Sequence, residues 1–170
     1  MNTRTIGVIG AVVIAAIVAG IALLGGDETQ ASETDGAFLA GMAPHHEMAI
    51  EMAEMAQERA EHPEIRQLAD DIIEAQTDEI ELIDSIHQRL FGEPLAAVDH
   101  ASMGLPAEQM GMGTDMGTLE TAKPFDRAFI DAMIAHHQGA IRMARIELAE
   151  GDDAETKALA DTIIAAQSAE

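Results

Sequence analysis

Apolar side chains recur every three or four residues in four stretches of this 170-residue chain, which predicts four amphipathic helices. In the first stretch, at 100° per residue, the inward-facing positions fall within an arc of roughly 120°, while the glutamates between them point away. The positions on this arc are Phe38, Met42, His45, His46, Ala49, Met52, Ala53 and Ala56. The two histidines are therefore expected to face the core.

The second helix is expected to begin at Pro63, a residue that is acceptable at the first helical position, and to run to Gly92. The fourth is expected to follow Gly151, with Asp152 and Glu155 spaced as a capping box. Because the links within each pair are short, both pairs are predicted to be antiparallel hairpins. Pro44 lies inside the first helix and is expected to kink it or to free a carbonyl group beside the histidines.

The sequence of the first hairpin is repeated later in the chain. Residues 35–79 align without a gap with residues 126–170, and 19 of the 45 positions are identical, far more than composition alone would supply. The second copy places Phe129, Met133, His136, His137, Ala140, Met143 and Ala144 on the same arc. The chain is therefore predicted to be all-α, a ferritin-like four-helix bundle built from two repeated helix hairpins.

We assign the bundle to residues 35–170, with repeat one at 35–91, a Met- and Gly-rich connecting loop at 92–121 and repeat two at 122–170. The second helix would be about 42 Å long. A loop of this size is long enough to travel that distance, which permits a ferritin-like crossover, and an up-down arrangement is the alternative. The fourth helix lacks counterparts of Ile80, Ile83, Ile86 and Leu90, so we expect the natural chain to continue beyond Glu170.

Residues 1–26 are predicted to be an N-terminal transmembrane helix, because residues 6–24 carry no charge and that length can span a bilayer. Arg4 precedes this segment and acidic residues follow it, which predicts a single-pass protein of the cell membrane with its domain on the extracytoplasmic side. Residues 27–34 would form a polar tether. The alternative is a cleaved signal peptide and a secreted or periplasmic protein.

Charge and composition narrow the range of possible functions. The net charge is −22, with 31 acidic and nine basic side chains, which disfavours nucleic acid and anionic lipid head groups as partners. Solubility or adaptation to salt is the favoured explanation of this charge, and attraction of cations is the alternative. The chain has four Phe and neither Trp nor Tyr, so base-stacking and sugar-binding platforms are not indicated. Without cysteine it has neither disulfides nor thiolate metal ligands. Methionine is abundant, with 11 residues.

The repeated histidines and methionines are candidate metal ligands. Adjacent histidines diverge by 100° on a helix, so a small ion would need ligands from a second helix, or each pair would serve separate ions. Imidazole together with thioether favours Cu(I), and by extension Ag(I), over hard ions. The candidate ligands are His45, His46, His136, His137, Met42, Met52, Met133 and Met143. The alternative is a non-metal interaction or sensor module in which the histidines form a structural polar layer.

Two further groups bear on this site. Gln76 and Glu79, repeated as Gln167 and Glu170, fall within the apolar stripe of the partner helices, where they would either ligate the metal or orient a histidine. In the connecting loop, His100, Met103, Met110, Met112 and Met116 have little to pack against and suggest a flexible thioether site, with scavenging of oxidants or low complexity as alternatives. For Asp35 and Asp126, helix capping is a sufficient explanation.

The sequence gives little indication of an enzyme. The di-iron carboxylate pattern requires Glu three residues before each histidine, and Met42, Ala43, Met133 and Ile134 stand there. Neither a nucleophile elbow, a phosphate loop nor HExxH is present in the sequence. We therefore predict that the protein is not an enzyme.

The doubled Met-x-x-His-His-x-x-Ala-Ile-x-Met-Ala, each followed by Leu-Ala-Asp-x-Ile-Ile-x-Ala-Gln-x-x-Glu, resembles the domain of unknown function 305 family over residues 35–170. The resemblance implies an exported or membrane-anchored bacterial ferritin-like bundle, and for some members it implies periplasmic copper binding and resistance. By position it points to the eight His and Met candidates named above. It therefore favours a copper ion as ligand, with buffering or transfer to a copper-handling partner protein as the role.

Overall fold

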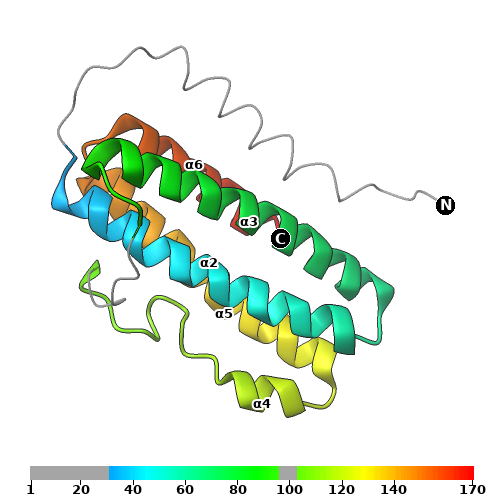
Figure 1. Ribbon diagram of the computed structural model, residues 1–170. Helices are drawn as coiled ribbons and strands as arrows, with labels where there is room; N and C mark the ends of the chain where they lie inside the picture. The colour runs from blue at the N-terminus through cyan, green and yellow to red at the C-terminus, as the bar shows by residue number, and fades with distance from the viewer. Residues whose placement is uncertain (1–30, 96–102) are drawn as a thin grey trace.

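The computed structural model describes residues 31–95 and 103–170. Within these residues four long helices form a bundle (Figure 1). They are α2 (Glu33–Arg59), α3 (Pro63–Phe91), α5 (Phe125–Glu150) and α6 (Ala154–Ala169), and the short helix α4 (Met116–Thr121) lies in the long connection. The predicted all-α class and the four-helix bundle are confirmed. The predicted membrane segment at 6–24 lies outside the described residues, and none of the helices within 31–95 and 103–170 combines the length and apolarity needed to cross a bilayer.

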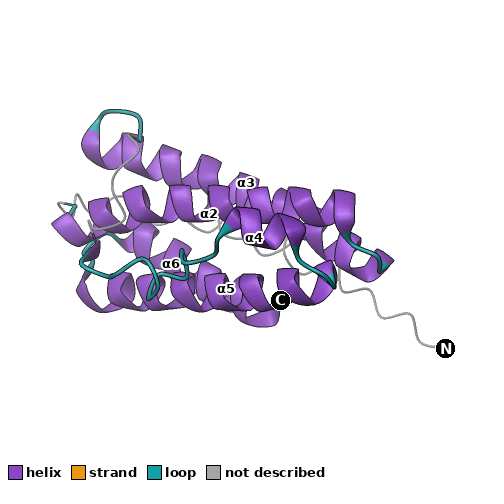
Figure 2. Cartoon of the chain, turned by 90° about the horizontal axis from the view of Figure 1, so that it is seen from below, coloured by secondary structure: helices purple, strands orange, loops and turns teal. Residues whose placement is uncertain are grey.

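The two hairpins pack through α2 and α5. In Figure 1, α3 runs toward the end of the bundle where α2 begins, and the chain then re-enters α5 at the opposite end. The described part of the connection, residues 103–124, runs along the bundle and carries α4, as Figure 2 shows from a second direction. Helices α3 and α5 therefore point the same way. This is the crossover that the loop length permitted, and the up-down alternative was wrong.

Local signals place most of the helix ends. Ser32 caps α2 and forms a capping box with Asp35, and α3 begins at Pro63 and ends at Gly92, whose φ of 76° is the left-handed conformation that glycine adopts freely. Helix α2 continues unbroken through Pro44. Since proline has no N–H, the carbonyl of residue 40 receives no hydrogen bond from it.

One predicted helix start was wrong by a residue. Helix α6 is capped by Asp153, whose carboxylate accepts the N–H of Thr156 at 2.9 Å, and not by Asp152. The reason lies in the other repeat. The N–H groups of Asp152 and Asp153 both donate to the buried carboxylate of Asp35, at 3.2 and 3.1 Å, which fixes the chain just ahead of α6.

A corresponding contact joins the hairpins at the other end of the bundle. Asp126, 91 residues after Asp35, accepts the N–H groups of Glu61 and His62 at 2.9 and 3.0 Å, and His62 Nδ1 lies 2.6 Å from the same carboxylate. Each aspartate therefore holds the turn of the opposite hairpin. Capping alone, which the sequence suggested, accounts for only part of what these two residues do.

A carboxyl group without a counterpart in repeat one lies beside Asp35. Glu147 is fully buried, and neither of its oxygens has a hydrogen-bond partner among the described residues. A Cβ at Gly151 would lie 2.0 Å from Glu147 Oε1, so glycine at that position makes room for the carboxyl group. Burial, followed by the neighbouring Asp35 carboxylate, raises the pKa of Glu147 to about 8.

This pKa predicts how stability changes with pH. Glu147 holds its proton up to about pH 8 when folded but only to about 4.5 when unfolded, so its contribution to stability falls as pH rises between these values. Glu147→Gln keeps the shape of the protonated form and removes this loss, so the stability of the variant relative to wild type should grow as pH rises from 5 and reach a few kcal/mol near pH 8. Urea unfolding at several pH values measures this, with the exposed Glu150→Gln as control. Parallel pH profiles for wild type and Glu147→Gln would contradict the assignment.

Candidate metal centre

A layer of polar side chains crosses the middle of the bundle and divides its apolar core into two clusters. On α2 and α5, residues on one side of the histidine pairs belong to one cluster and residues on the other side belong to the second. On α3, Ile72 and Ile83 likewise belong to different clusters, with Gln76 and Glu79 between them. The layer consists of His45, His46, Gln76, Glu79, His136, His137, Gln167 and Glu170. The prediction that the histidines face inward is confirmed, because all four are buried.

The centre of the layer is a pair of histidines from different helices. The rings of His45 on α2 and His136 on α5 lie with their centroids 3.7 Å apart and their planes inclined at 37°. Neighbours on one helix are much farther apart, with 6.3 Å between the rings of His45 and His46 and 6.2 Å between those of His136 and His137. The divergence expected for adjacent histidines is therefore present, and it is the second helix that brings two rings together.

The outer histidines are each held by a glutamate. His46 Nε2 lies 2.7 Å from Glu79 Oε2, and His137 Nε2 lies 2.6 Å from Glu170 Oε2. His45 Nε2 donates to the carbonyl oxygen of Met110 at 2.8 Å. An oxygen acceptor at Nε2 selects the tautomer that carries its proton there, which leaves a lone pair on Nδ1. Glu79 and Glu170 thus contact histidine, as expected for side chains that orient a ligand.

The inner nitrogens of the layer have no partners. Within residues 31–95 and 103–170, the Nδ1 atoms of all four histidines, Nε2 of His136, and the side-chain amides of Gln76 and Gln167 are buried without a hydrogen bond. Buried polar atoms are nearly always satisfied by protein, water or an ion. Their accumulation in one layer marks it as a place where a polar or ionic ligand can bind.

The central rings are uncharged at neutral pH. Burial, and then the proximity of His136, lowers the pKa of His45 well below its usual value. Burial, and then the proximity of His137, lowers the pKa of His136 to about 3. The lone pairs of both rings are therefore free for a metal ion at pH 7 without loss of a proton.

The four candidate methionines flank the histidines on both sides. Met42 and Met143 lie in the core cluster on one side, and Met52 and Met133 lie in the cluster on the other. All four are buried. Within the described ranges 31–95 and 103–170, no three side chains drawn from His, Cys, Asp and Glu are placed to hold a metal ion. Imidazole and thioether are the donor types gathered around the central pair, and together they suit Cu(I) or Ag(I).

The connecting loop differs from its prediction. Met110 has 1% of its surface exposed, Met103 and Met112 pack against the same cluster, and Met116 packs against the other cluster, so the expectation that loop methionines have little to pack against was wrong for all four. Met110 reaches the core because Gly139 leaves a depression on α5, where a Cβ would lie 1.7 Å from the Met110 carbonyl oxygen. His100 lies outside the described residues. The sequence signal was the replacement of Met48 by glycine at the matching position of repeat two.

Comparison with known proteins assigns this chain to a family. A family model described as "Domain of unknown function (DUF305)" matches residues 35–170. The chain belongs to this family. The resemblance noted in the sequence is thereby confirmed.

Solved structures of similar proteins have the same overall fold. The structure of CopM in its Cu(I)-bound form is 40% identical to this chain, covers 79% of it and 88% of the CopM chain, and has a TM-score of 0.68. CopM in an Ag-bound form gives the same identity and coverage with a TM-score of 0.67. A DUF305 fragment from Deinococcus radiodurans is 28% identical, covers 82% of this chain and 91% of that fragment, and has a TM-score of 0.71.

A curated relative covers a smaller part of the chain. The uncharacterized protein L153 of Acanthamoeba polyphaga mimivirus is 48% identical over 58 residues, which is 34% of this chain and 38% of the relative. The match therefore extends over well under half of either protein. It is consistent with the family assignment and adds no activity.

Proposed function

We propose that this DUF305 protein binds copper as Cu(I) through its buried histidine layer and buffers it or passes it on, without catalysing a reaction. The observation that carries the proposal is the pair His45 and His136, whose rings meet at the bundle centre with unpartnered nitrogens and with methionines on both sides. CopM, which is 40% identical, has been solved with Cu(I) bound, and this supports the choice of metal.

In this proposal the central histidines supply nitrogen ligands, and two or more of Met42, Met52, Met133 and Met143 supply sulfur. His46 and His137 either complete the ligand set or stand beside it, oriented by Glu79 and Glu170. Bound Cu(I) would be enclosed by apolar core on both sides, which shields it from water and oxidants. In this proposal the protein is a ferritin-like bundle that an N-terminal membrane helix tethers outside the cytoplasm. Its partner would be a copper-handling protein.

A second candidate function rests on the contacts that the histidines already make. His45, His46 and His137 each have an oxygen partner at Nε2, which is what a structural polar layer in an interaction or sensor module would require. This function explains three ring contacts. It leaves the inner nitrogens and both glutamine amides without a role.

Competition for Cu(I) separates the two functions. The protein is titrated with Cu(I) against a chromogenic chelator, beside a variant in which all four paired histidines are replaced by alanine. Copper binding predicts that wild type withdraws metal from the chelator at micromolar concentration and that the variant has lost this ability. A wild type that cannot compete would exclude the copper proposal, and equal binding by a folded variant would exclude the histidine layer as the site.

A further inference from the structure

We infer that a groove on the outer surface of α2 is a second site for a soft monovalent cation such as Cu(I) or Ag(I), built from the thioethers of Met48, Met112 and Met116. It lies outside the histidine layer and shares none of its side chains. The groove has a volume of about 460 Å³. Its lining residues are Pro44, Glu47, Met48, Ile50, Glu51, Glu54, Met112 and Met116.

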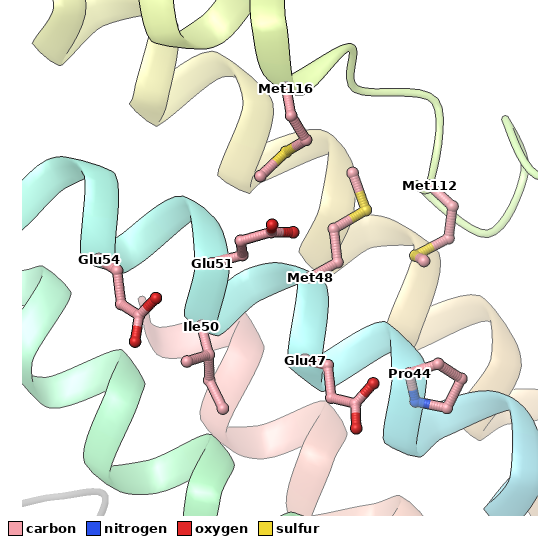
Figure 3. Close-up of a pocket in the computed structure, with 8 residues that line it drawn as sticks. All are labelled: Pro44, Glu47, Met48, Ile50, Glu51, Glu54, Met112 and Met116. Atoms are coloured by element: carbon pink, nitrogen blue, oxygen red, sulfur yellow. The ribbon is translucent and has the colours of Figure 1, made fainter. Parts of the chain in front are cut away.

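The three methionines come from three separate segments and converge. Met48 projects from α2, Met112 from the connecting loop and Met116 from the start of α4, and all three line the groove, with Met48 between the other two (Figure 3). All three are only partly buried. They pack against the edges of the two core clusters and keep part of their surface exposed, whereas Met52 and Met110 are buried.

The backbone that carries the loop methionines is held in place on both sides. Upstream, the Met110 carbonyl accepts from His45 Nε2 at 2.8 Å, and the Gln109 carbonyl accepts from Arg142 Nε at 2.6 Å. Downstream, Asp115 caps α4 by accepting the N–H of Thr118 at 2.6 Å. Met112 and Met116 are therefore presented to Met48 at fixed positions, which reduces the entropy lost when a ligand binds.

The charge of the groove suits a cation. Glu51 lies beside Met48 and below Met116, and Glu47 lies beside Pro44 below Met112 (Figure 3). Thioethers are neutral, so the carboxylates supply the negative charge that attracts and balances a bound monovalent ion. Soft sulfur donors select d¹⁰ monovalent metals over the hard divalent cations that carboxylates alone would favour.

The groove is single, in contrast to the doubled histidine motif. The position that matches Met48 in repeat two is Gly139, which is covered by the backbone of Met110. The connecting loop occurs once. The inference therefore predicts one such site per chain, additional to any metal bound in the histidine layer.

The test counts bound Ag(I), a probe that is not oxidised in air, per chain by equilibrium dialysis. The variant Met48→Leu/Met112→Leu/Met116→Leu conserves volume and apolarity but removes the sulfur atoms, so it should fold and bind one Ag(I) fewer than wild type. Met55→Leu is the matched control, because Met55 is a partly buried methionine of α2 that does not line the groove. Unchanged stoichiometry in the triple variant would overturn the inference.

Methionine methyl NMR keeps this result separate from that of the histidine layer. With ¹³C-labelled methionine methyl groups, Ag(I) should shift the signals of Met48, Met112 and Met116 in wild type. It should still do so when His46, His136 and His137 are replaced by alanine, a variant that keeps the hydrogen bond from His45 to Met110. If those three signals stay unmoved while the histidine ring signals respond, the groove is not a site and the histidine layer still is. Movement of the three groove signals alone supports the groove and contradicts the proposed histidine site.

Discussion

Gly139→Ala is expected to destabilise the protein by about 2 kcal/mol or more, although alanine normally stabilises a helix interior relative to glycine by about 1 kcal/mol. The added Cβ would lie 1.7 Å from the carbonyl oxygen and 2.0 Å from the carbonyl carbon of Met110, and backbone cannot move aside cheaply. The loop would be displaced from α5, and the bond from His45 to Met110 would be lost with it. Urea unfolding measures the effect.

Gly117→Ala is the control for this substitution. Gly117 lies in α4, and a Cβ there would meet nothing closer than 3.6 Å, so this variant should be at least as stable as wild type. A Gly139→Ala protein that is as stable as wild type, with its loop still protected from hydrogen exchange, would show that the loop does not seat on α5 as described.

Asp35→Ala is expected to cost about 3 kcal/mol or more, and Asp126→Ala distinctly less. The two aspartates make corresponding contacts, since each accepts two backbone N–H groups from the turn of the opposite hairpin. They differ in exposure, which is 0% for Asp35 and 9% for Asp126. Water can replace the lost acceptor more readily at the exposed end, whereas the N–H groups near Asp35 would remain buried and unpaired.

Chemical denaturation of the two variants side by side measures this difference. Equal losses of unfolding free energy, or a larger loss for Asp126→Ala, would contradict the role assigned to burial. The pair is informative because the two substitutions remove the same side chain from matching positions, so differences in helix propensity largely cancel.

The sequence predicted the inner faces of α2 and α5 correctly because helical periodicity is a local signal. His45, His46, His136 and His137 are inward on spacing alone, and the structure has them buried. Gln76 and Glu79 also fell on the apolar stripe of α3 and are buried there. For these residues the neighbours along the chain carry enough information, because an amphipathic helix has only one face that it can bury.

Contacts between distant segments could not be predicted in this way. The contact between the rings of His45 and His136 depends on how α2 and α5 pack. The burial of Met110 depends on the absence of a side chain at Gly139. The binding of Asp35 to the turn before α6 is of the same kind, although the recurrence of Asp35 as Asp126 hinted at a shared role. Glu147 could have been noticed as an acid on the apolar arc with a glycine four residues later.

The groove around Met48 likewise could not be predicted from the sequence. Met48 lies between Glu47 and Ala49 on α2 and has no special position in the repeat, since glycine replaces it in the second copy. Only the path of the connecting loop brings Met112 and Met116 to it. A site formed by three segments far apart in sequence has no signature in any one of them.

The measurement that most directly tests copper binding by the central layer is the Cu(I) competition titration of two double variants, His45→Ala/His136→Ala and His46→Ala/His137→Ala. All four histidines have a free Nδ1, but the central rings lie against each other across two helices, whereas each outer ring is bound to a glutamate at Nε2. We predict that the first variant loses at least about 100-fold in affinity at the high-affinity site, and that the second loses about 10-fold to 100-fold. A folded His45→Ala/His136→Ala protein that holds Cu(I) as tightly as wild type would contradict the claim.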